Sequence, residues 1–149
     1  MCRKRNAAAE AADALGVKVS RATAALPQTA AAAIFTVTGR VLLRGIVGEV
    51  TTVIQTQANN TKLTLNGVVD VDLCAVLDIT ADAVGTIYGI TGTFGDAMVG
   101  AGSAAVFPAR MLVLEPGTID LSCAASNTGA VKWDLWYIPL EPSATVVAA

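Results

Sequence analysis

The sequence contains no histidine, and this absence excludes several kinds of chemistry at once. Ser-His and Cys-His catalytic pairs need the imidazole as a general base, and histidine is also the commonest metal ligand. The glycine-rich stretch at residues 85–102 fits neither the phosphate-binding loop nor the dinucleotide-binding pattern. Glycines there indicate bulges, tight loops or close approach of another backbone. We therefore expect no enzyme activity, no catalytic residue, no bound metal and no cofactor.

Charge is also scarce. Only 15% of the 149 residues are charged, against 54% hydrophobic, whereas an average globular domain is about a quarter charged. This composition argues against intrinsic disorder and indicates that other subunits cover part of the surface. The apolar runs, such as residues 30–35, fall far below the roughly 18 residues of a membrane-spanning helix, so we expect no membrane partner.

The three cysteines, Cys2, Cys74 and Cys123, form no C-x-x-C pair and are odd in number. They predict reduced thiols in a protein made in a cytoplasm, and a disulfide framework is not expected at this size. Cys74 follows Asp70 and Asp72 at alternate positions, which would share one face of a strand. Two carboxylates are too few for calcium, which takes six to eight oxygen ligands, so we expect a solvent-facing side of a strand.

Residues 1–33 differ in composition from the rest of the chain. Thirteen of them are alanine, and five basic residues against two acidic ones leave a net charge of +3, whereas residues 34–149 carry five basic and ten acidic residues, a net −5. We expect an extended N-terminal arm, with room for a short helix over residues 7–15. The arm would contact an acidic partner, act as a flexible tether, or solubilise the end of the chain. Candidate contact residues in it are Arg3, Lys4, Arg5 and Leu26.

Residues 34–149 alternate apolar and polar side chains, which is the pattern of half-buried strands. Turn signals recur at intervals of about ten residues, and Asn66-Gly67 predicts a two-residue hairpin turn. One continuous strand or pair of strands is expected over residues 68–79. About eight strands of this kind predict an all-β domain, a jelly-roll-like β-sandwich. In the last expected strand Trp133 and Tyr137 share one face, which leaves Trp136 on the other face as a candidate subunit contact.

Three stretches carry a resemblance to a known group: residues 34–55 (IFTVTGRVLLRGIVGEVTTVIQ), 116–121 (PGTIDL) and 129–140 (GAVKWDLWYIPL). Together they resemble small virion-associated proteins encoded in the structural modules of tailed bacteriophages. Such proteins commonly serve as head decoration or cement proteins, or as neck and tail parts. The resemblance implies self-assembly and docking on a capsid, and it covers residues 34–149 only.

From these observations we expect a capsid cement protein that forms a homo-oligomer, a trimer, and binds the major capsid protein or another virion protein. It would be made in the host cytoplasm and reside in the virion, with no nucleic-acid partner. Two alternatives remain open at this stage: a neck or tail structural protein, and a carbohydrate-binding jelly roll at a receptor-binding tip. The carbohydrate-binding function would require clustered exposed aromatic residues, and aromatics make up only 5% of the chain.

Overall fold

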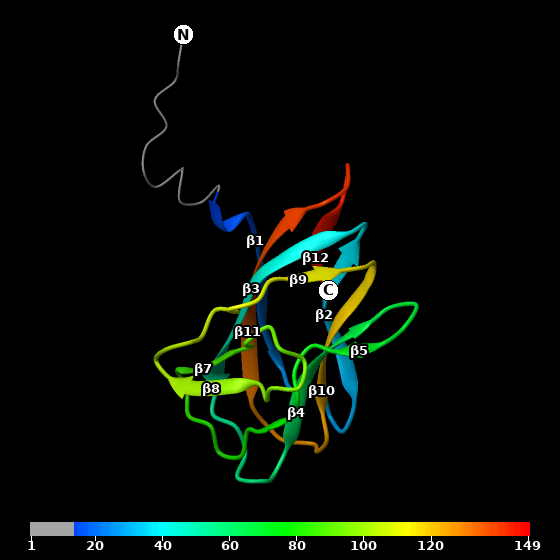
Figure 1. The fold of residues 1–149 in the computed structure, drawn as a ribbon. Helices are drawn as coiled ribbons and strands as arrows, with labels where there is room; N and C mark the ends of the chain where they lie inside the picture. The colour runs from blue at the N-terminus through cyan, green and yellow to red at the C-terminus, as the bar shows by residue number, and fades with distance from the viewer. Residues whose placement is uncertain (1–13) are drawn as a thin grey trace.

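The computed structural model describes residues 14–149, which form two six-stranded antiparallel sheets (Figure 1). The expectation of an all-β protein is confirmed. The strands are β1 (Val17–Ala25), β2 (Ala31–Thr38), β3 (Val41–Thr52), β4 (Asn60–Asn66), β5 (Val71–Asp72), β6 (Leu77–Asp78), β7 (Thr86–Gly89), β8 (Val99–Gly102), β9 (Leu112–Leu114), β10 (Gly117–Cys123), β11 (Ala130–Pro139) and β12 (Thr145–Ala148).

The first sheet, sheet A, has the strand order β1-β11-β3-β7-β8, and β9 also pairs with β3. The second, sheet B, has the order β12-β2-β10-β4-β5, and β6 also pairs with β4. Strands that are close in sequence therefore often belong to different sheets. Two contacts connect the sheets at their edges. An isolated parallel bridge joins Ala75, between β5 and β6, to Ala97, before β8. The Arg21 Nε on β1 donates to the carbonyl oxygen of Ala149, which follows β12, at 3.3 Å.

The core is built by alternation of buried and outward side chains, which is most regular on β11. Along β11, Trp133, Leu135 and Tyr137 are buried, while Asp134 and Trp136 between them are not. The expected alternation of the last strand is therefore confirmed. Gly48 on β3 makes room for the Trp133 ring, since a Cβ at Gly48 would stand 2.7 Å from the ring carbon Cζ3.

The expected boundary at residue 34 is wrong, because strand β2 begins at Ala31 and runs across it. Upstream, β1 pairs with β11 over residues 17–25, from Val17 opposite Tyr137 to Ala25 opposite Ala130. Main-chain hydrogen bonds hold this edge strand, and such bonds do not require large side chains. The alanine-rich composition that indicated an arm therefore also fits a strand. The expected helix at 7–15 lies almost wholly outside the described residues.

Twelve strands over residues 14–149 replace the expected eight or so. The strand or pair of strands expected over residues 68–79 is a pair, β5 and β6, each two residues long, and residues 145–148 form a further strand, β12. The expected two-residue turn at Asn66-Gly67 is also wrong, because neither residue has a positive φ. The register pairs Leu65 with Val71, so residues 67–70 form a longer connecting loop between β4, which ends at Asn66, and β5.

Candidate assembly surfaces

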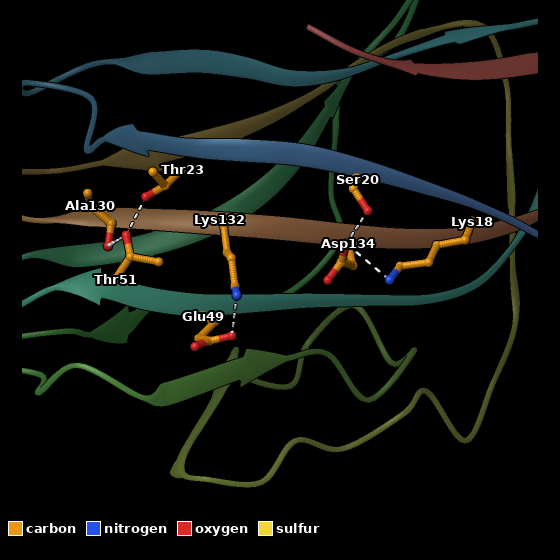
Figure 2. Close-up of polar contacts among 8 residues, drawn as sticks. All are labelled: Lys18, Ser20, Thr23, Glu49, Thr51, Ala130, Lys132 and Asp134. Carbon is orange, nitrogen blue, oxygen red and sulfur yellow. Dashed lines mark hydrogen bonds and ion pairs between the residues drawn. The ribbon is translucent and has the colours of Figure 1, made fainter.

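Polar side chains cover one part of the outer face of sheet A (Figure 2). Ser20 on β1 donates to Asp134 Oδ1 on β11 at 2.6 Å, and Lys18 Nζ lies 3.7 Å from the same oxygen. One strand further, Lys132 Nζ lies 2.9 Å from Glu49 Oε2 on β3. Each pair is exposed to solvent, where an ion pair contributes about 0–1 kcal/mol. These contacts align three strands, and they leave the surface nearly balanced in charge.

Two threonines extend this polar region toward the other end of the strands. Thr51 on β3 donates to the Ala130 carbonyl oxygen at 3.3 Å. The Thr23 hydroxyl on β1 hydrogen-bonds to the Thr51 hydroxyl, so the side chains reach each other across β11, as Figure 2 shows. The pair therefore ties the edge strand β1 to a central strand near the point where the β1 register shifts.

An aromatic pair occupies a different part of the same outer face. The ring centroids of Phe107 and Trp136 are 5.3 Å apart, and Lys18 Nζ lies 5.5 Å from the Trp136 ring centroid. Trp136 is half-buried between these neighbours, whereas Phe107 remains 45% exposed. A cation near an aromatic ring is attracted to its electron-rich face. The pair is therefore an ordered surface feature that belongs to β11 and to the loop preceding β9.

That loop, residues 103–111, runs closely over glycines of sheet A. A Cβ at Gly89 would stand 2.6 Å from the Val106 carbonyl oxygen, and a Cβ at Gly92 would overlap the Arg110 carbonyl. The expectation that some of these glycines allow close approach of another backbone is confirmed. The loop thereby brings Phe107 onto the sheet.

Apolar side chains continue from the aromatic pair toward the ends of the strands. The register places Val113 on β9 opposite Leu42 on β3, and Leu42 opposite Ile138 on β11. These three residues alternate with core residues and therefore face outward. Met111 is 50% and Val113 56% exposed. We call this region the aromatic surface; it comprises Leu42, Phe107, Met111, Val113, Trp136 and Ile138.

A second apolar feature is the connection between β4 and β5, which projects at the right of Figure 1. We call residues 67–70 the valine loop. Val68 is 103% and Val69 82% exposed, the two most exposed large apolar side chains among the described residues. A hollow of about 350 Å³ lies beside them, lined by Leu65, Gly67, Val68, Val69, Glu115 and Pro116. Neither valine contributes to the core, so folding does not explain their apolar character.

The candidate contact residues have different outcomes. Arg3, Lys4 and Arg5 lie outside the described residues. Leu26 is only 3% exposed and belongs to the core of its own chain, so its selection as a partner contact is wrong. Its backbone amide donates to the Gly129 carbonyl oxygen at 3.1 Å, which draws the end of β1 into the sandwich. Trp136 faces outward as expected, although Phe107 and Lys18 partly cover it.

The alternating acidic residues do not converge on one site. Asp72 Oδ2 accepts from Lys62 Nζ at 2.7 Å on the outer face of sheet B. Cys74 is buried on the opposite side of the chain, where its sulfur accepts from the Leu63 amide at 3.4 Å. Within residues 14–149 no three potential metal ligands lie together. Asp72 therefore takes part in a cross-strand ion pair.

Both described cysteines are buried free thiols. Burial raises the pKa of Cys74, and it likewise raises the pKa of Cys123. The Thr61 hydroxyl donates to the Cys123 sulfur at 3.7 Å. A thiol with a raised pKa is a poor nucleophile because little thiolate is present, so these two cysteines act as core residues.

Two aspartates, one at the end of β6 and one in the loop before β7, also have structural partners. Asp78 Oδ1 accepts from the Thr80 hydroxyl at 2.6 Å and from the Asn59 amide at 2.9 Å, and these hydrogen bonds lower its pKa. Asp82 Oδ2 accepts from the buried Tyr88 hydroxyl at 2.5 Å. The two carboxylates border a polar cleft of about 200 Å³. Their hydrogen bonds organise the loop that joins the two sheets there.

Sequence reasoning missed Phe107, Val68 and Val69 as surface features. Phe107 lies within the loop of residues 103–111, and the two valines lie at the start of the strand or pair of strands expected over residues 68–79. Both signals were ambiguous without knowledge of which strands pair.

Comparison of the chain with protein-family profiles, with curated proteins and with solved structures finds no match. Among residues 14–149 no helix has the length and apolar character needed to cross a membrane.

Proposed function

We propose that this chain is a non-enzymatic structural protein of a tailed-bacteriophage virion, a decoration protein that assembles with copies of itself and stabilises the head shell. The observation that carries the proposal is the aromatic surface. Phe107, Met111 and Val113 expose apolar side chains together on one sheet face. Contiguous exposed apolar patches of this kind mark sites of protein–protein contact.

The strand orders support a jelly-roll form of the sandwich. The chain alternates between sheets in its first four strands and again in its last four. Early strands also pair with late ones, as β1 does with β11 and β2 with β10. Jelly rolls combine two Greek keys in two sheets in this way. We propose this topology as the architecture of the domain.

A decoration protein can stabilise a head shell simply by binding to it, through mass action. A protein that binds only the assembled shell lowers the free energy of the assembled state and leaves the free capsid protein unaffected. In this proposal the oligomer is a trimer, and the major capsid protein is its partner. Arg3, Lys4 and Arg5 supply a basic segment that an acidic shell surface would attract. A neck or tail position would use the same surfaces, so virion imaging must decide between these locations.

The direct experiment measures co-sedimentation with phage shells that lack this protein. The wild-type chain should sediment with the shells, and a variant carrying Met111→Asp and Val113→Asp should bind at least tenfold more weakly. Val84→Asp is the matched control, because Val84 is 61% exposed and lies outside the aromatic surface. If the double variant bound the shells as tightly as the wild type, the aromatic surface would not be the contact with the shell. Absence of wild-type binding to shells, necks and tails would reject the virion function.

A further inference from the structure

The sandwich carries two exposed apolar surfaces whose charged borders are of opposite sign. We infer that they bind each other between neighbouring copies, so that the valine loop of one copy docks on the aromatic surface of the next. This inference rests on the self-assembly proposed above and names the two surfaces that meet. The partner is therefore a second copy of this chain, bound head to tail.

The valine loop is acidic at its border. Asp70 follows the two valines directly, and it makes no ion pair with any residue of the described part of the chain. Glu115 and Asp72 lie nearby, although Arg40 and Lys62 respectively pair with them at 2.7 Å. Three carboxylates against two cations leave a net charge of −1 around the loop.

The aromatic surface is basic at its border. Arg44 Nη1 lies 2.8 Å from the Met111 sulfur, and Arg110 precedes Met111 in the chain. Over residues 14–149 neither arginine forms an ion pair with a carboxylate. Lys18 lies against Trp136 and is shared with Asp134. Three cations against one carboxylate leave a net charge of +2. Complementary potentials of this kind select a partner and orient it.

The charged borders of the two surfaces favour a head-to-tail contact. In Figure 1 the valine loop projects at the right, and the loop of residues 103–111 runs from β8 at the left to β9, which leads to Glu115 and Pro116 beside the hollow of the valine loop. A two-fold contact of valine loop with valine loop would bring like charges together, and so would contact between two aromatic surfaces. Either would also leave the other apolar surface exposed. A head-to-tail contact covers both surfaces, and such contacts form rings when the rotation closes.

The shapes are also compatible. Val68 and Val69 form a narrow projection of two aliphatic side chains, while Phe107, Met111 and Val113 lie on a broad sheet face. Because both valines are almost fully exposed, no rearrangement of the core is needed to present them. Apolar contact would provide the affinity, and the charged borders would fix the orientation.

A complementation experiment tests this arrangement. Val68→Asp disables the loop and leaves the aromatic surface intact; Arg110→Glu with Met111→Asp disables the surface and leaves the loop intact. Each variant alone should raise the dissociation constant at least tenfold and give the monomer mass of 15.1 kDa in light scattering. Their equimolar mixture should form two-copy complexes, because one copy supplies the surface and the other supplies the loop. Val84→Asp, at a valine that is 61% exposed and lies outside both surfaces, should assemble like the wild type.

The outcomes separate this inference from the broader proposal. A wild-type oligomer whose mass is unchanged by Val68→Asp would reject the head-to-tail contact and leave self-assembly standing. A mixture that remains at 15.1 kDa would also reject it. A wild type that stays monomeric from micromolar concentration upward would reject both. Circular dichroism verifies folding, and Val69→Asp and Arg44→Glu provide the same test if a first variant does not fold.

Discussion

Gly45 on β3 lies directly beneath the ring of Phe107. A Cβ at Gly45 would stand 2.9 Å from the ring carbon Cδ1 and closer still to two other ring carbons. The absence of a side chain at this position therefore allows the 103–111 loop to place Phe107 against the sheet and within 5.3 Å of Trp136, measured between ring centroids. One glycine thus controls the shape of the aromatic surface.

We predict that Gly45→Ala displaces Phe107 and leaves the sandwich folded. The added methyl group overlaps a side chain that is 45% exposed and can swing into solvent. Trp136 should become more accessible, which acrylamide quenching of tryptophan fluorescence would detect. Gly95→Ala is the control, because a Cβ at Gly95 meets no atom within 4 Å. Unchanged quenching in Gly45→Ala would contradict the proposed packing of the loop.

Gly48→Ala should instead destabilise the whole domain. A Cβ at Gly48 would stand 2.7 Å from the Trp133 ring, and Trp133 is only 1% exposed, so the ring cannot move into solvent. Forcing extra atoms into a packed core typically costs about 1–3 kcal/mol. Urea denaturation measures the change in the free energy of unfolding. Gly102→Ala, where a Cβ meets no atom within 4 Å, should cost much less.

Deletion of residues 2–33 should unfold the domain, whereas deletion of residues 2–13 should not. The longer deletion removes β1, the start of β2 and the buried Leu26. Leu26→Ala by itself should lower the free energy of unfolding by about 2–5 kcal/mol. Leu15→Ala, at a position that is 40% exposed, should have a small effect. Thermal melts followed by circular dichroism give both comparisons, and a folded 34–149 fragment would contradict the role of β1.

The two buried thiols should resist alkylation in the native protein. Burial raises the pKa of Cys74 and of Cys123, which lowers the thiolate fraction, and it also restricts access. In a Cys2→Ser background, iodoacetamide at pH 8 should label neither cysteine quickly until urea is added. Mass spectrometry counts the modified residues. Rapid labelling of the folded chain would show that the core around one of these cysteines opens readily.

Stability should decline above pH 10, and Tyr88 should contribute to that decline. Burial, followed by the hydrogen bond to Asp82, raises the pKa of Tyr88 above its ordinary value of 10.0. The unfolded chain loses this proton near pH 10 and the folded chain retains it, so higher pH favours unfolding. The stabilisation is therefore complete below pH 10 and is lost progressively above it.

Tyr88→Phe tests this contribution. The variant should be less stable at pH 7, because it loses a hydrogen bond worth about 1 kcal/mol and leaves Asp82 without that donor. The difference in the free energy of unfolding between wild type and variant should then shrink as pH rises above 10. Parallel curves for the two proteins would show that Tyr88 does not ionise differently in the folded and unfolded states.

The elements that sequence reasoning predicted well are those whose side chains report burial directly. On β11 Val131, Trp133, Leu135 and Tyr137 recur at every second position, and this period of two is sufficient to assign a strand with one buried face. On β1 the side chains are mostly small, and only Val19 packs against the core while Val17 remains exposed. Its pairing depends on main-chain hydrogen bonds to β11, which side-chain patterns do not record.

By itself the sequence determined that the protein is all-β, that one face of β11 is core, and that histidine-dependent chemistry is excluded. The tertiary structure alone decided that Leu26 is buried, that Val68 and Val69 project outward, and that Phe107 reaches Trp136. The physical reason is the range of the interactions. Local alternation reflects which side of a strand meets a core, whereas exposure of a particular apolar residue depends on which distant strand or loop covers it.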